Sequence, residues 1–176
     1  MAKRTAFLGL ATALAMIVSY VETLIPFHPG IPGAKIGLTN IVILIVLYRS
    51  GFRDAVSVSG VRIVLTGFLF GNLSAVLYSL AGGAVSLCVM QFLKAGLPQK
   101  GSNMNRKESK FSILGVSMAG GVAHNLGQLL VAVFVVENAN LLYYLPFLIV
   151  SGLVAGICIG MIAREMMKSL GGIQQT

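Results

Sequence analysis

The residue with the most unusual chemical setting is Arg62, which lies near the middle of the apolar stretch DAVSVSGVRIVLTGFLFG at residues 54–71. This stretch has the length and composition of a membrane helix. A guanidinium at the centre of a bilayer costs at least about 2.5 to 3.5 kcal/mol, so we expect Arg62 to face protein, water or a ligand. Either it contacts the head of a ligand, or Glu22 or helix C-terminal carbonyls neutralise it and it holds the helices together.

A second polar cluster lies in the segment GGVAHNLGQLL, where His124 and Gln128 are one helical turn apart on the same face and Asn125 is beside them. Amide side chains also join helices to one another, but three such groups within five positions favour a ligand site. The predicted ligand-binding residues are Arg62, His124, Asn125, Gln128, Asn40, Lys35 and Glu22. Cationic groups surrounded by amides suit a small ligand with an anionic or carbonyl-rich head.

The elements that carry these residues are predicted to be membrane helices. Of the 176 residues, 56% are hydrophobic and 10% are charged, against about 25% charged in a soluble domain. Since a span needs roughly 20 apolar residues, one all-α integral membrane domain over residues 1–176 has room for about six spans. The predicted helices cover about residues 5–24, 35–48, 55–71, 73–95, 111–136 and 141–163, with a basic loop at 96–110.

The positions of the basic residues predict the orientation of this bundle. With both termini in the cytoplasm, 11 of the 13 basic residues fall on the cytoplasmic side: Lys3, Arg4, Arg49, Arg53, Lys94, Lys100, Arg106, Lys107, Lys110, Arg164 and Lys168. The positive-inside rule therefore favours six helices with cytoplasmic termini, and it accounts for the net charge of +8 without nucleic acid. Lys35 and Arg62 are the exceptions, placed to meet a ligand from outside.

Several kinds of chemistry are excluded by missing motifs. The chain has no GxxxxGK[ST] nucleotide motif and no HExxH metal motif. Asp54 is its only aspartate, so it lacks the paired carboxylates that would hold a magnesium diphosphate. Cys88 and Cys158 stand alone, without metal spacing. We therefore predict no catalytic residues, metal or cofactor, and interpret the chain as a binding subunit rather than an enzyme.

Two further segments have two readings each. The segment GLATALA in the first helix contains two pairs of small residues four positions apart, Gly9 with Ala13 and Ala11 with Ala15. Small residues at this spacing allow another helix to approach closely. That helix belongs either to this chain or to a partner. PFHPGIPG at residues 26–33 cannot form a regular helix, so it is an outer loop that either closes a site or only connects two helices.

The motifs GAKIGLTNIVILIVLY and GGVAHNLGQLLVA, with Arg62 between them, resemble the bacterial membrane family of heptaprenyl diphosphate synthase component I, also called the Gx transporter family. The resemblance runs from about residue 8 to 163. This family in turn resembles the substrate-binding S components of energy-coupling-factor (ECF) vitamin transporters. The resemblance implies an S-component-like bundle in the bacterial cytoplasmic membrane that captures a small molecule outside.

In that reading the partners are a transmembrane coupling protein and ATPase subunits, and the small residues Gly9, Ala11, Ala13 and Ala15 meet the coupling protein. The ligand is a flavin, another vitamin, or a quinone or isoprenoid precursor. The alternative function is that of a membrane accessory component of isoprenoid or quinone synthesis without a synthase site of its own. A third reading is a structural subunit whose polar residues only pack helices.

Overall fold

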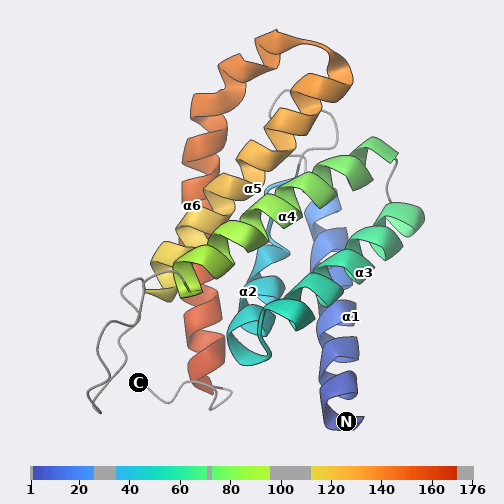
Figure 1. Cartoon of the computed structure of the whole chain (residues 1–176), viewed down its shortest axis with the longest axis vertical. Coiled ribbons are helices and arrows are strands. Elements are labelled where there is room, and N and C mark those ends of the chain that lie inside the picture. Colours follow the sequence, from blue (N-terminus) through green and yellow to red (C-terminus); the bar gives the residue numbers. More distant parts are fainter. Residues whose placement is uncertain (1, 26–34, 71–72, 96–111, 170–176) are drawn as a thin grey trace.

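The computed structural model describes residues 2–25, 35–70, 73–95 and 112–169. All regular secondary structure in this part of the chain is helical (Figure 1). The six α-helices are α1 (Ala2–Leu24), α2 (Asn40–Arg49), α3 (Phe52–Phe70), α4 (Leu73–Ala95), α5 (Ile113–Val136) and α6 (Leu145–Ser169), with a 3-10 helix, η1 (Ala139–Tyr144), before α6. The predicted all-α class is thus confirmed for the described residues.

Successive helices run in alternating directions, so the beginning of α1 and the end of α6 lie at the same end of the molecule (Figure 1). Two helix boundaries differ most from the sequence-based ones: the start of α2 and the end of α6. α2 was expected to begin at Lys35, but residues 35–37 have no regular secondary structure and 38–39 form a turn. α6 also extends to Ser169, beyond the expected end at 163.

Four helical segments are long and apolar enough to cross a membrane: α1, α4, α5, and η1 together with α6. The protein is therefore a multi-pass helical membrane protein. α2 has 10 residues, which is about 15 Å of helix and half of a bilayer core. α3, which carries Arg62, is not among the four. A count of six spans and cytoplasmic termini remain predictions.

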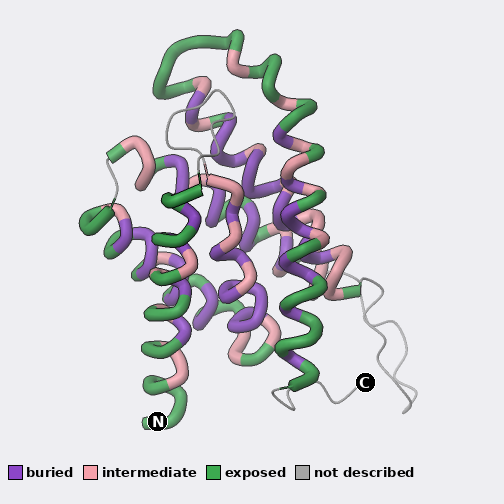
Figure 2. Tube along the Cα trace, turned by 180° about the vertical axis from the view of Figure 1, so that it is seen from behind, coloured by how far each residue is buried: buried purple, intermediate pink, exposed green. Residues whose placement is uncertain are grey.

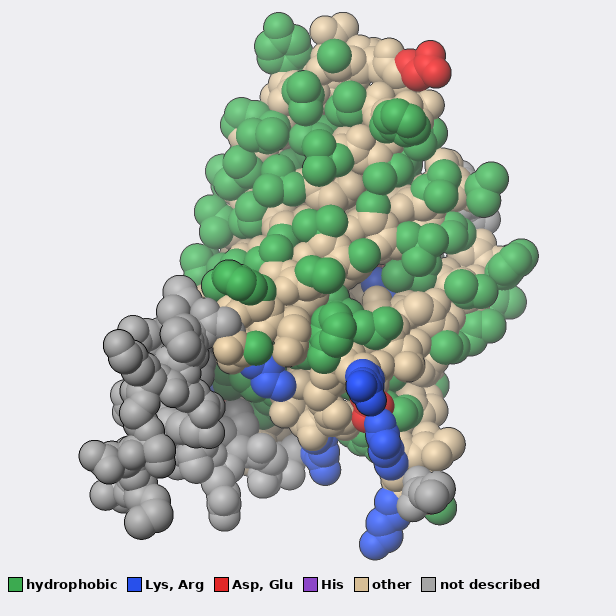
Figure 3. Space-filling model, in the orientation of Figure 1, with side chains coloured by type: hydrophobic (Ala, Val, Ile, Leu, Met, Phe, Trp, Pro, Cys, Tyr) green, Lys and Arg blue, Asp and Glu red, His purple; other side chains and the backbone are tan. Residues whose placement is uncertain are grey.

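The outer surface of the bundle is apolar, as lipid contact requires. Figure 2 shows buried positions on the inner sides of the helices and exposed ones outside, and the exposed ones include Phe68 at 87% and Phe134 at 84%. Figure 3 shows hydrophobic side chains over most of one face, with blue Lys and Arg side chains gathered at the end where α1 begins.

Glycines allow α5 and α6 to pack backbone to backbone. In α6, Gly152, Gly156 and Gly160 recur every four residues along one face. A Cβ on Gly156 would lie 2.5 Å from the Cα of Met118 and 2.8 Å from the Ser117 carbonyl oxygen, both in α5. Small residues at this spacing let membrane helices approach closely. α5 and α6 are accordingly the most closely packed helix pair in the described structure.

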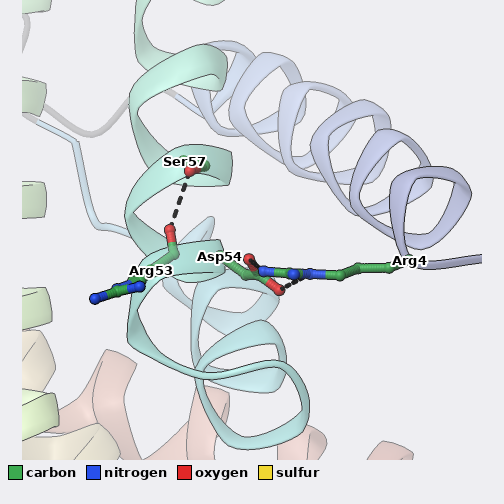
Figure 4. Close-up of polar contacts among 4 residues, drawn as sticks. All are labelled: Arg4, Arg53, Asp54 and Ser57. Atoms are coloured by element: carbon green, nitrogen blue, oxygen red, sulfur yellow. Dashed lines mark hydrogen bonds and ion pairs between the residues drawn. The ribbon is translucent and has the colours of Figure 1, made fainter. Parts of the chain in front are cut away.

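A salt bridge joins α1 to α3 at the basic end of the molecule (Figure 4). The Arg4 guanidinium donates to both carboxylate oxygens of Asp54, at 3.0 Å from Nε and 2.5 Å from Nη2. Nearby, the Ser57 hydroxyl donates to the Arg53 carbonyl at 3.0 Å. α1 and α3 thus form one side of the bundle, α4, α5 and α6 form the other, and α2 contacts helices of both.

Candidate functional site

Arg62 of α3 is buried, with 2% of its surface exposed. Its Nε has no hydrogen-bond partner, and the guanidinium forms no ion pair with any residue that the structure describes. The Glu22 carboxylate is close enough to attract it, but not to pair with it directly. Because a buried unpaired cation is costly, Arg62 is a candidate to bind an anionic partner.

Glu22, near the end of α1, is also buried, and its side chain holds the chain that leads into α2. One carboxylate oxygen accepts the backbone N–H of Gly37 and that of Leu38 at 3.2 Å, and the other accepts the Thr39 hydroxyl at 3.4 Å. These donors belong to the residues directly before α2, where backbone N–H groups have no partner within the helix. Glu22 therefore holds residues 37–39 against the end of α1, ahead of the first turn of α2.

The segment 35–39 also contacts α5. The Gln128 side-chain oxygen accepts the backbone N–H of Lys35 at 3.2 Å, while the Gln128 side-chain nitrogen lies 2.9 Å from Nε2 of His124. The Lys35 ammonium donates to the Ser19 hydroxyl of α1 at 3.4 Å. The segment 35–39 is thus a strap between α1 and α5, and it carries one of the two cations of the site.

Gly37 allows the strap to lie directly against His124. Its φ of +89° is in the region that favours glycine, and a Cβ there would come within 2.9 Å of the His124 ring carbon Cδ2. The Nδ1 atom of His124 is buried without a hydrogen-bond partner among the described residues. His124 Nδ1 and Arg62 Nε are therefore two buried polar atoms of this region without a hydrogen-bond partner among the described residues, while Nε2 of His124 contacts Gln128.

Lys35 lies outside the helices but is largely enclosed. Its pKa is lowered from the usual value of 10.5, first because burial disfavours the charged ammonium; Glu22 counters this, and Arg62 adds to it. An anion bound between the two cations would reverse the lowering, since an opposite charge stabilises the ammonium form.

Asn40 and Asn125 have partners within the protein. The Asn40 amide donates to Ser86 of α4 at 3.3 Å, and the Ser86 hydroxyl donates to the Gly120 carbonyl of α5 at 2.8 Å. The Asn125 amide donates to the Leu148 carbonyl at 2.8 Å and to the Ser151 hydroxyl at 3.1 Å, both in α6. The structure thus brings Glu22, Lys35, His124 and Gln128 together through the strap, with Arg62 within their electrostatic reach, and turns Asn125 toward α6.

The small residues of α1 divide between two faces. Ala11 and Ala15 are buried inside the bundle, whereas Gly9 and Ala13 are exposed. Only the second pair is therefore available to a partner in this arrangement. The segments PFHPGIPG and 96–110 lie outside the described residues.

Sequence reasoning missed Ser19 and Thr39, which support Lys35 and Glu22, and the pairing of Arg4 with Asp54. The interior spacing of Ser19 and Glu22, three residues apart on one face of α1, was a usable signal for the first. Nothing in the sequence pairs Arg4 with Asp54 over a separation of 50 residues.

In Figure 3 a blue Lys or Arg side chain is visible in a hollow of the apolar face, away from the basic end. Arg62 and Lys35 are the two described basic residues that do not belong to that end. Among described residues, no group of three His, Cys, Asp or Glu side chains could hold a metal ion. The arrangement is suited to binding an anionic group, with apolar surface around it.

Comparison with known proteins adds one match. The family model described as heptaprenyl diphosphate synthase component I matches residues 11–166, which is most of the chain. No curated protein matches the chain, and no solved structure does.

Proposed function

The chain belongs to the heptaprenyl diphosphate synthase component I family, and from this premise we propose that it is a non-catalytic membrane subunit that binds a small, largely apolar molecule by an anionic head. The observation that carries the proposal is the buried guanidinium of Arg62, which has no ion-pair partner among the described residues and whose Nε has no hydrogen-bond partner. Arg62 binds the head, Lys35 adds a second cation, and Gln128 and Glu22 hold the strap in place over His124.

The first candidate role is that of an accessory component in isoprenoid or quinone synthesis. The family's description as one component of a synthase supports a separate partner that carries out the chemistry. The described part of the chain has no carboxylate pair for a magnesium diphosphate, since Asp54 is paired with Arg4 and Glu22 is occupied by the strap. The protein would then present a quinone or isoprenoid precursor to that partner.

The second candidate role is that of an S component of an ECF-type uptake transporter. One observation favours it specifically: Gly9 and Ala13 form a small-residue stripe on the outside of α1, where a coupling protein could approach. Arg62 and Lys35 are also the two basic residues that the positive-inside count does not assign to the cytoplasmic side. The ligand would then enter from outside, and ATP hydrolysis would belong to partner subunits.

The test combines ligand identification with partner identification. Small molecules released from the purified protein are identified by mass spectrometry, for the wild type and for Arg62→Gln, and co-purifying proteins are identified from the same membranes. An anionic isoprenoid or quinone precursor with a soluble prenyl synthase supports the first role; a vitamin with ATPase subunits supports the second. A folded Arg62→Gln protein that retains the same ligand at wild-type occupancy would refute the proposed site.

A further inference from the structure

The charges around Arg62 restrict the head group further. We infer that the site takes a ligand with one carboxylate, a monoanion, and discriminates against a diphosphate. This inference rests on the proposed function, because it concerns the ligand of the same site.

Two cations are available to the ligand. Arg62 is always protonated and has no ion-pair partner among described residues. The Lys35 ammonium has a hydroxyl, that of Ser19, as its described partner, so its charge is not neutralised by direct contact. The positive charge of Arg62 disfavours the charged form of Lys35. An anion bound near both cations would relieve this repulsion.

One anion is already in place. Glu22 accepts two backbone N–H groups and a hydroxyl, and has donors on both of its oxygens. Burial of Glu22 disfavours its charged form, whereas the N–H groups of Gly37 and Leu38 and the charges of Lys35 and Arg62 favour it. With donors on both oxygens and two cations nearby, we assign Glu22 as the ionised carboxylate. Its lone pairs are directed to the strap, so it compensates charge without occupying the place where Arg62 would meet a ligand.

His124 adds no charge. It lies near both Arg62 and Lys35, and it is buried; two neighbouring cations and the loss of hydration both favour the neutral imidazole. Two cations against one carboxylate therefore leave a single positive charge, which one carboxylate head would balance.

A diphosphate would not be balanced. Phosphate groups carry roughly 1.5 to 2 negative charges each when terminal, so a diphosphate head would leave at least one uncompensated negative charge beside the buried Glu22. Proteins normally meet that excess with Mg²⁺ held by carboxylates, and Glu22 is the one acidic residue of the described chain near Arg62. A planar carboxylate, in contrast, matches the fork of the guanidinium.

Matched probes test the inference. The protein in lipid nanodiscs is titrated with farnesoate, farnesyl diphosphate and farnesol, and with 2-naphthoate, 2-naphthyl diphosphate and 2-naphthol, and binding to empty nanodiscs is subtracted. One of the two sets, farnesyl or naphthyl, should have an apolar part that fits the site. In that set we expect the carboxylate to bind at least about ten-fold more tightly than the diphosphate or the alcohol, because only the carboxylate balances the single positive charge without leaving an excess negative charge. A diphosphate that binds as tightly as the carboxylate would overturn the inference and leave the proposed function standing.

Equal binding of the uncharged alcohol would also overturn it, since the head would then not be recognised. If no probe of either set binds, both this inference and the proposed function are refuted. Glu22→Gln provides the decisive variant because it adds one positive charge to the site: the preference for carboxylate over diphosphate should fall several-fold. Lys35→Gln, outside the helices, is the second variant, and because it removes a positive charge it should raise the preference for carboxylate over diphosphate. If the ratio of the two affinities is unchanged in both folded variants, the charge argument is refuted.

Discussion

The Gln128 side chain of α5 accepts the backbone N–H of Lys35 at 3.2 Å, and this hydrogen bond joins two residues that are 93 positions apart in the chain. Together with Glu22 it fixes the strap between the two sides of the bundle. The geometry of the proposed ligand site is consequently set by backbone groups as well as by charged side chains.

Gly37→Ala should destabilise the protein and weaken ligand binding. The substitution combines a φ of +89° with a contact of 2.9 Å to His124, and backbone strain of this type alone costs about 1 to 3 kcal/mol. Gly51→Ala is the matched control, since Gly51 has a φ of +97° with nothing within 4 Å of an added Cβ. The melting temperature in detergent should fall further for Gly37→Ala; equal losses would show that the contact with His124 is unimportant.

Gly156→Ala should separate α5 from α6. An added methyl group would meet the backbone of Met118 and Ser117, and overpacking of this kind costs about 1 to 3 kcal/mol. Gly9→Ala serves as the comparison, because nothing lies within 4 Å of its added Cβ. Thermal unfolding of both variants checks the prediction. A melting temperature of Gly156→Ala equal to that of the wild type would refute it.

Asn125→Ala should lower stability but leave ligand affinity nearly unchanged. The Asn125 amide contacts Leu148 and Ser151 of α6, so its loss removes interhelical hydrogen bonds worth about 0.5 to 1.5 kcal/mol each. Gln128→Ala should instead weaken binding, since it releases the strap. Titration of both variants with the best probe of the matched sets separates the two roles, and a large affinity loss in Asn125→Ala would place that residue in the site.

Binding of an anionic probe should weaken at alkaline pH. The pKa of Lys35 is lowered from 10.5, chiefly by burial, with Glu22 raising it and Arg62 lowering it further. The ammonium form that binds the anion is therefore lost as the pH rises through a value below 10.5. The free protein should show the opposite trend, because removing a proton from a buried lysine favours the folded state.

Lys35→Arg is the control for this pH dependence. Arginine remains protonated over the same range, so the alkaline loss of affinity should disappear in the variant. If the loss persists unchanged, another group is responsible for it.

Ala13→Leu tests the outer face of α1. Ala13 is exposed, so the variant should fold and bind ligand, but it should no longer co-purify with a coupling protein if that protein packs on Gly9 and Ala13. Ala15→Leu, at a position with no exposed surface, should lower stability instead. Undiminished co-purification of Ala13→Leu would argue against an interface there.

Local sequence patterns predicted the helices well and the strap poorly. α4 begins and ends where expected, because its apolar run is bounded on both sides by polar or glycine-containing segments. The start of α2 was misplaced by five residues. The hydrogen bonds that hold Lys35 and Gly37 outside the helix are made by Glu22 and Gln128, which are distant in sequence. Helical periodicity did place His124 and Gln128 together, and the same periodicity turns Asn125 about 100° away from His124.

The composition of α3 has a consequence for how the protein is made. α3 carries Arg53, Asp54 and Arg62 and is not among the helices apolar enough to cross a membrane by themselves. The insertion machinery must therefore receive it against an unfavourable transfer free energy. Its contacts with α1, including the pairing of Arg4 with Asp54, lie toward a helix that is synthesised earlier. We therefore expect α1 to assist the insertion of α3, so that damage to α1 lowers the amount of assembled protein in the membrane before any defect in binding is measured.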